Sequence, residues 1–148
     1  MTVQQLESVA QDIVADARGI LAADESTPTI GKRFETIGVE STEDSRCAYR
    51  ALLFTTAGLG EFVSGAILYD ETIRQSSPEG VPIVDILQGQ GIHPGIKVDT
   101  GAKALAGAAG EKVTEGLDGL RERIAEYREL GATFAKWRAG ITIGDAIP

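Results

Sequence analysis

Apolar residues recur along this chain with two alternating spacings. A spacing of three or four positions predicts an amphipathic helix over residues 2–17 and another over residues 117–130. A third helix is expected over residues 43–57, since the sequence STED at 41–44 is typical of a helix start. Short apolar runs between these helices predict strands, which fall at residues 20–23, 62–69, 95–99 and 131–141.

The stretches between these elements are expected to be irregular. Residues 24–33 form a hydroxyl-rich polar segment, and residues 100–119 are dominated by glycine and alanine, so both predict loops. Shorter connections are expected as turns or loops at residues 70–72, 76–82 and 144–148. Residues 84–88 form a short element whose type the pattern does not decide.

This order of elements predicts an α/β fold. Strands that alternate with helices are usually parallel and joined by right-handed crossovers. Both doubly wound sheets and (β/α)₈ barrels of this kind place their chemistry at the C-terminal ends of the strands. The barrel is favoured because Lys97 and Asp99 share one strand face, as do Lys136 and Arg138, with apolar residues on the opposing faces.

Charged residues in or just after the strands are the main departure from an ordinary core pattern. Lys136 and Arg138 lie two positions apart in a predicted buried strand, and Lys97 interrupts another. Acidic pairs, at 24–25 and 70–71, follow the first two strands. Buried cations need an anionic partner or ligand. For Lys136 and Arg138 alone, an amphipathic strand facing solvent fits about equally well.

Composition narrows the class of protein. At 148 residues the chain suits a single domain, and a net charge of −8 disfavours binding to nucleic acid or to an anionic membrane, so a cationic site must be local. The single cysteine, Cys47, allows no internal disulfide, which favours a reducing cytoplasm; a buried, unreactive thiol is expected. No apolar run or basic leader predicts membrane insertion or secretion.

The remaining polar motifs predict neither a metal site nor a dinucleotide-binding site. His93 is the only histidine and is expected in a loop, so a metal centre is not expected. The glycine-rich segment at 89–95 lacks the spacing of a dinucleotide-binding loop and predicts a flexible strand entry.

Four ionisable side chains could carry chemistry: Asp24, Lys97, Lys136 and Arg138. If the third and fourth strands are neighbours, about 4.8 Å apart, Lys97 and Lys136 repel, and repulsion with burial favours a neutral amine able to attack a carbonyl or to shuttle a proton. Asp24 could be its proton partner. The hydroxyls of Ser26, Thr27 and Thr29, with Arg33, suit a phosphate site or, equally, the start of a helix.

Four motifs together resemble the class I fructose-bisphosphate aldolases. They are GILAADEST at 19–27, GIKVD at 95–99, GLDGL at 116–120 and FAKWR at 134–138, in the family's order, and the resemblance runs from about Leu6 to Pro148. It implies a (β/α)₈ TIM barrel that cleaves fructose 1,6-bisphosphate to dihydroxyacetone phosphate and glyceraldehyde 3-phosphate, in cytoplasmic glycolysis and gluconeogenesis. The reaction would proceed through a lysine Schiff base, without metal or other cofactor.

The resemblance also implies roles for particular residues. Asp24 matches an aspartate that works in proton transfer and carbon–carbon cleavage, and Lys136 matches a lysine that positions and polarises substrate. Thr29 and Pro28 stand where many members have serine and glycine, which keeps the hydroxyl in a stiffer loop. The residues expected to contact substrate or its phosphates are Ser26, Thr29, Arg33, Lys97 and Arg138.

The match covers only the first four strands of the family's barrel, so residues 1–148 are expected to be the N-terminal part of one barrel domain. The Schiff-base lysine lies in the other part, and we expect this chain alone to be inactive. Open sheet edges predict a homo-oligomer or aggregation. Two alternatives remain: a non-catalytic half-barrel that binds sugar phosphates or pairs with a second half, and an enzyme that uses Lys136 itself as nucleophile.

Overall fold

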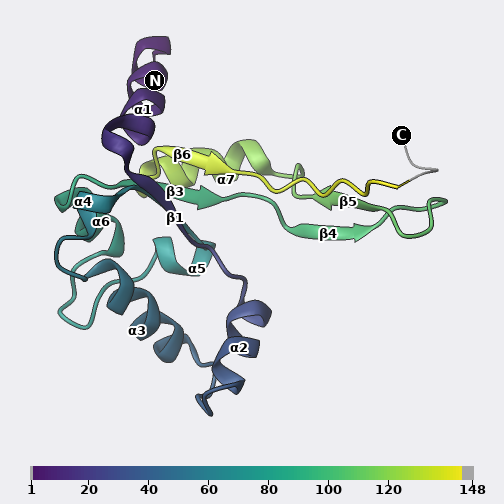
Figure 1. Ribbon diagram of the computed structural model, residues 1–148, viewed down its shortest axis with the longest axis horizontal. Helices are drawn as coiled ribbons and strands as arrows, with labels where there is room; N and C mark the ends of the chain where they lie inside the picture. The colour runs from purple at the N-terminus through teal and green to yellow at the C-terminus, as the bar shows by residue number, and fades with distance from the viewer. Residues whose placement is uncertain (1, 145–148) are drawn as a thin grey trace.

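A computed structural model of the chain describes residues 2–144 and contains a four-stranded parallel sheet (Figure 1). The strand order is β1-β2-β3-β6, so β1 and β6 are the two edges. The strands are β1 (Gly19–Ala23), β2 (Val63–Leu68), β3 (His93–Lys97) and β6 (Phe134–Lys136). The α/β class, the parallel pairing and the positions of the first three strands are therefore confirmed.

The long fourth strand expected over residues 131–141 is wrong, because β6 has only three residues. Its last residue, Lys136, pairs with Lys97, which is the last residue of β3. In the described part of the chain, no neighbouring strand continues beyond this pair. The backbone N–H of Arg138 binds the Asp99 carboxylate at 3.2 Å instead of a strand partner.

Helices connect the strands, and three of them lie where no helix was expected. The expected helices are present as α1 (Val3–Val14, followed by a 3₁₀ turn, Ala15–Ala17), α3 (Glu43–Phe54) and α7 (Leu120–Glu129). The loop expected over residues 24–33 is limited to residues 24–26, because α2 (Thr27–Glu35) begins directly after them. Pro28 lies in its first turn, where a missing N–H costs no hydrogen bond. The expected turn at 70–72 is the one-turn helix α5 (Asp70–Ile73). The other short helices are α4 (Leu59–Phe62) and α6 (Ile83–Gly89), the latter resolving the undecided segment.

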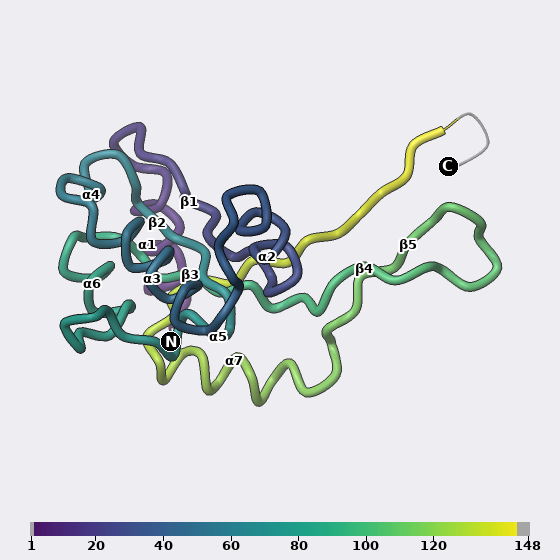
Figure 2. The backbone as a smooth tube through the Cα atoms, turned by 90° about the horizontal axis from the view of Figure 1, so that it is seen from below, coloured from purple at the N-terminus to yellow at the C-terminus, as the bar shows by residue number. Residues whose placement is uncertain are grey.

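The glycine- and alanine-rich stretch is a hairpin rather than a long loop. Its strands β4 (Gly101–Ala104) and β5 (Lys112–Glu115) pair in antiparallel fashion. Figures 1 and 2 show the hairpin projecting from the sheet beyond the end of β3. Small side chains gave no strand pattern here, since only backbone pairing defines the element. Residues 145–148 of the expected C-terminal turn lie outside the described residues.

Among residues 2–144, helices cover only one face of the parallel sheet. Leu68 and Ile96 on that face pack with Phe54 of α3, Leu87 of α6 and Tyr127 of α7, all nearly inaccessible to solvent. The opposite face carries small residues beside a large one. A methyl group added at Gly95 would lie 2.2 Å from the Phe134 ring, so the glycine makes room for that ring. No helix among residues 2–144 has both the length and the apolar content needed to cross a membrane.

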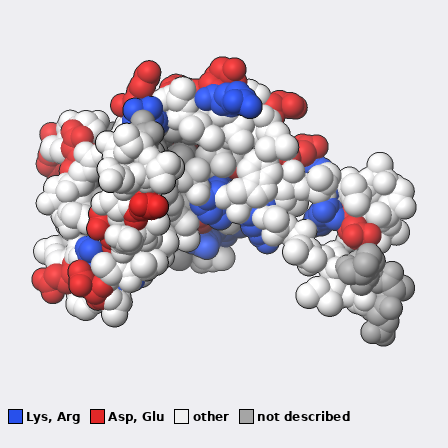
Figure 3. Space-filling view, turned by 90° about the horizontal axis from the view of Figure 1, so that it is seen from above, with Lys and Arg blue, Asp and Glu red and all other residues white. Residues whose placement is uncertain are grey.

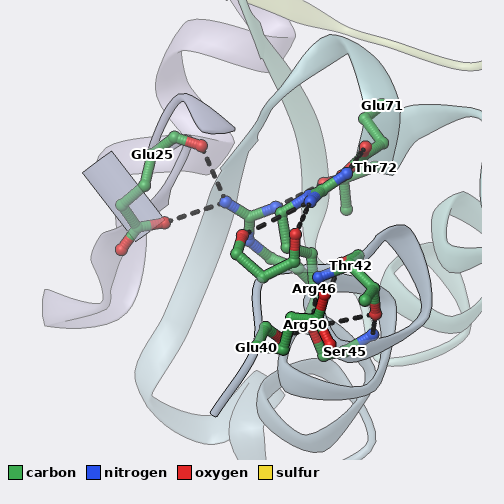
Figure 4. Close-up of polar contacts among 9 residues, drawn as sticks. Glu25, Glu40, Thr42, Ser45, Arg46, Arg50, Glu71 and Thr72 are labelled. Atoms are coloured by element: carbon green, nitrogen blue, oxygen red, sulfur yellow. Dashed lines mark hydrogen bonds and ion pairs between the residues drawn. The ribbon is translucent and has the colours of Figure 1, made fainter. Parts of the chain in front are cut away.

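Two arginines of α3 attach this helix to the C-terminal side of the sheet (Figure 4). The Arg50 side chain is only 1% exposed and donates to the Thr72 hydroxyl at 2.7 Å and to the Glu25 carbonyl oxygen at 2.9 Å. It also binds the Glu25 carboxylate at 3.1 Å. Arg46 forms two hydrogen bonds, of 2.8 and 2.6 Å, with the Glu71 carboxylate. Through these contacts α3 holds the turn that follows β1.

We expect Arg50→Ala to lower the free energy of unfolding by about 3 kcal/mol, because it leaves buried polar groups of Glu25 and Thr72 without their donor. Urea unfolding followed by circular dichroism measures the effect. Arg121→Ala, at an exposed position of α7, is the matched control and should change stability by less than about 0.5 kcal/mol. Equal stability of the two variants would contradict a structural role for Arg50.

Candidate active site

A cleft of about 520 Å³ lies at the C-terminal ends of the parallel strands. It contains all seven side chains expected to form the site, and Figure 3 shows Lys and Arg side chains gathered in the hollow between the helical body and the projecting arm. The lining residues are Ala22, Asp24, Glu25, Ser26, Thr29, Arg33, Tyr69, Lys97, Asp99, Thr100, Gly101, Ala102, Lys112, Thr114, Lys136, Arg138 and Gly140.

The central contact is an ion pair between Asp24 and Lys136. Asp24 directly follows β1, and Lys136 ends β6, so the pair joins the two edges of the sheet. Lys136 Nζ donates to Asp24 Oδ2 at 2.5 Å, and the two side chains are 29% and 10% exposed. A flat sheet would hold these edge strands about 14 Å apart, three strand spacings. The sheet therefore curves toward the cleft so that its outer strands can share this contact.

Lys97 and Lys136 are paired neighbours on β3 and β6, so the condition for their proximity is met. The expectation of two repelling amines is incomplete, because each lysine has its own carboxylate. Lys97 Nζ lies 2.5 Å from Asp99 Oδ1 and also donates to the Asp99 carbonyl oxygen at 2.6 Å. The cleft thus holds two ion pairs, Lys136 with Asp24 and Lys97 with Asp99.

Asp99 joins three segments of the chain although its side chain is only 3% exposed. Besides Lys97, its carboxylate accepts the backbone N–H of Gly101, at the start of β4, and that of Arg138, each at 3.2 Å. Burial alone would raise the pKa of Asp99, but the Lys97 ammonium and the Arg138 amide outweigh it and hold that pKa below its usual range. Asp99 was expected on the same strand face as Lys97 but was given no role. The signal for a role was an acid and a base on one face of a buried strand.

The α2 end of the cleft carries the hydroxyls and Arg33. Ser26 occupies the N-cap position of α2, as the capping alternative expected, but its hydroxyl makes no capping hydrogen bond and lies 3.0 Å from the Thr29 hydroxyl. Arg33 forms an ion pair with Glu25, the same carboxylate that Arg50 holds from the core. Glu25 therefore links the buried arginine to a cation of the cleft.

Arg138 lies at the mouth of the cleft rather than in a buried strand. It follows β6 and is exposed, so the expectation of two buried cations on one strand face is wrong for this residue. Its carbonyl oxygen accepts the Thr114 hydroxyl of the hairpin at 2.8 Å. The hairpin and the segment after β6 thus form one wall of the cleft.

Two residues considered in the sequence lie outside the cleft. His93 is not in a loop, because it is the first residue of β3, at the end opposite to Lys97, where its ring contacts the Thr133 hydroxyl at 3.4 Å. Cys47 is half-buried in α3 rather than fully buried, and burial together with nearby carboxylates raises the pKa of its thiol. Within residues 2–144, no three His, Cys, Asp or Glu side chains are placed to share a metal ion.

We expect Asp99→Asn to destabilise the chain by roughly 2 kcal/mol at pH 7, the scale of hydrogen bonds to a charged group. A carboxyl whose pKa is lowered on folding adds stability above its unfolded pKa and loses it as pH falls through the folded value. The difference from wild type should therefore shrink below about pH 3.8, the ordinary value for aspartate. Urea unfolding at pH 7, 5, 4 and 3 measures it.

Asp118→Asn, at an exposed position, is the control for a loss of one negative charge. If both variants lose the same stability at every pH, the Asp99 carboxylate does not hold the charges of the cleft in place.

Comparison with known proteins gives one consistent family. A family model described as fructose-bisphosphate aldolase class-I matches residues 5–148. A probable fructose-bisphosphate aldolase class 1 from Xanthomonas campestris is 59% identical over 148 residues. Fructose-bisphosphate aldolase 1 from Toxoplasma gondii is 57% identical over 143 residues, 97% of this chain.

Solved structures agree with this result. A fructose-bisphosphate aldolase from Plasmodium falciparum, in complex with TRAP and a small-molecule inhibitor, superposes with a TM-score of 0.89 and 53% identity over 91% of this chain. That match covers 39% of the Plasmodium chain, and the Xanthomonas match covers 44% of its relative. The chain thus spans about two fifths of the length of the relatives that it matches.

Proposed function

The chain belongs to the class I fructose-bisphosphate aldolases, and we propose that its residues 1–148 form the N-terminal part of one (β/α)₈ TIM-barrel domain. The proposal is supported by the curvature of the four-stranded parallel sheet and by the helices that cover only its outer face. In a barrel of this kind the helices form the outer ring, and the site residues lie at the C-terminal ends of the strands.

The complete enzyme would cleave fructose 1,6-bisphosphate to dihydroxyacetone phosphate and glyceraldehyde 3-phosphate, a step of glycolysis and gluconeogenesis in the cytoplasm. The observation that carries this proposal is the Asp24–Lys136 pair at 2.5 Å, inside a cleft rich in cations. Cleavage of the bond between C3 and C4 requires a group that accepts the C4 hydroxyl proton while the bonding electrons move toward C2. Asp24 is suited to accept this proton, and Lys136 to orient Asp24 and the substrate oxygens.

Electron withdrawal at C2 would come from a Schiff base with a lysine that we place in the part of the protein beyond this chain. No metal or other cofactor is needed, because an iminium group itself takes up the electrons. The cations Arg33, Lys97 and Arg138 would bind phosphate or substrate, aided by the hydroxyls of Ser26 and Thr29. Open sheet edges favour a homo-oligomer, with neither nucleic acid nor membrane as a partner.

A second candidate function is a non-catalytic half-barrel that binds sugar phosphates or pairs with a second half. The surplus of cations in the cleft favours binding of phosphates even without turnover.

In the complete enzyme, Lys136→Met or Asp24→Ala should lower kcat by at least about 10²-fold, the scale of a lost acid–base group. Steady-state cleavage of fructose 1,6-bisphosphate measures this change. Lys32→Ala removes an exposed cation of α2 that does not line the cleft, and it should leave kcat within about twofold. Near-normal turnover of the Lys136 and Asp24 variants would defeat their assignment.

A borohydride trap distinguishes the two candidate functions and locates the nucleophile. With fructose 1,6-bisphosphate, the 148-residue chain should give no reduced adduct, while the complete enzyme should give a stoichiometric one, located by mass spectrometry. Circular dichroism must first establish that the short chain is folded. An adduct on Lys136 or Lys97 would mean that this chain carries its own nucleophile, and absence of an adduct in the complete enzyme would favour the non-catalytic function.

A further inference from the structure

The β4–β5 hairpin turns one of its faces toward the cleft. Ala102 pairs with Thr114 and Ala104 with Lys112, so these four residues share a face, while Lys103 and its partner Val113 belong to the other. Ala102, Thr114 and Lys112 line the cleft, and Lys103 does not. The hairpin therefore presents one lysine to the cleft and one away from it.

Hydrogen bonds at the base of the hairpin fix this orientation. Thr100 N donates to the Glu115 carbonyl oxygen at 2.9 Å, and Gly101 N donates to the Asp99 carboxylate at 3.2 Å. The Thr114 hydroxyl, on the same face as Lys112, binds the carbonyl oxygen of Arg138 at 2.8 Å. Lys112 lies two residues before Thr114, and the contact of Thr114 with Arg138 attaches this strand of the hairpin to the segment after β6.

The charge balance of the cleft leaves cations available. Five cationic side chains line it, whereas its carboxylates are only Asp24, Glu25 and Asp99. Each of these carboxylates already binds a cation, namely Lys136, Arg33 together with Arg50, and Lys97, respectively. Lys112 and Arg138 form no ion pair with any residue among 2–144. A positive surplus in a chain of net charge −8 marks a place for an anion.

We propose that Lys112 binds a phosphate group of the sugar-phosphate substrate, from the hairpin wall of the cleft. This inference rests on the proposed function and adds a binding residue that neither the motifs nor the strand pattern predicted. Lysine suits the position because its long side chain carries a compact charge that can follow a phosphate without fixed geometry. Lys112 need not leave a carboxylate partner to do so, in contrast to Arg33.

The test compares two lysines of one hairpin in the complete enzyme. Lys112→Ala should raise KM for fructose 1,6-bisphosphate about fivefold to tenfold, the effect of one typical hydrogen bond at an exposed position, and leave kcat within about twofold. Lys103→Ala removes the same charge from the opposite face and should change neither constant. Lys112→Arg should restore KM to within about twofold of wild type.

Equal KM values for Lys112→Ala and Lys103→Ala would overturn the proposal about Lys112. If the wild-type enzyme still cleaves the bisphosphate in that case, the proposed function stands. If wild type does not cleave the bisphosphate at all, the proposed function fails and this inference fails with it. Inhibition by inorganic phosphate tests whether Lys112 binds the phosphate group of the substrate or a free phosphate at a separate site. Weaker inhibition of Lys112→Ala at an unchanged KM would assign Lys112 to a separate anion site and also overturn the proposal.

Discussion

The ion pair between Asp24 and Lys136 is the contact on which the cleft depends, because it connects the two outer strands of a four-stranded sheet. Parallel pairing aligns the C-terminal ends of the strands, but it does not set the distance between the two edge strands, which depends on the curvature of the sheet. A carboxylate that is 10% exposed cannot remain there without a cation, and within residues 2–144 the strand end that supplies one to Asp24 belongs to the opposite edge. The need of Asp24 for a cation and the curvature of the sheet therefore support each other.

The pairing of carboxylates with cations continues from the cleft into the core. Glu25 binds Arg33 on the cleft side and Arg50 on the core side, so the turn after β1 is held between a surface cation and a buried one. Arg50 in turn reaches Thr72 after β2 (Figure 4). The ends of β1 and β2 are thus fixed by a helix that packs on the far face of the sheet, which keeps Asp24 in place through its chain neighbour.

Sequence reasoning recovered the parts of this architecture that depend on side-chain pattern. The spacing of apolar residues predicted the strands β1, β2 and β3 and the larger helices. Charged residues in or just after the strands singled out four side chains of the cleft, and the family resemblance added Ser26, Thr29 and Arg33, which also line it. It missed α2 because hydroxyls and Pro28 read equally well as a loop or as a first helical turn. It missed the hairpin because backbone pairing, not side chains, defines it. It overextended β6 because the length of a strand depends on its neighbour, which ends at Lys97.

The pairing of charges, which sequence did not reveal, decides how the cleft can receive an anion. Lys97 and Lys136 lie side by side and remain together because Asp99 and Asp24 neutralise them. A phosphate that approaches either lysine must also meet its carboxylate, so repulsion reduces the gain from each contact. Lys112 and Arg138 impose no such cost, since neither is paired within residues 2–144. Under the proposed function, an entering phosphate would therefore gain most at the wall formed by the hairpin and the segment after β6, while the paired lysines would orient the reacting part of the sugar.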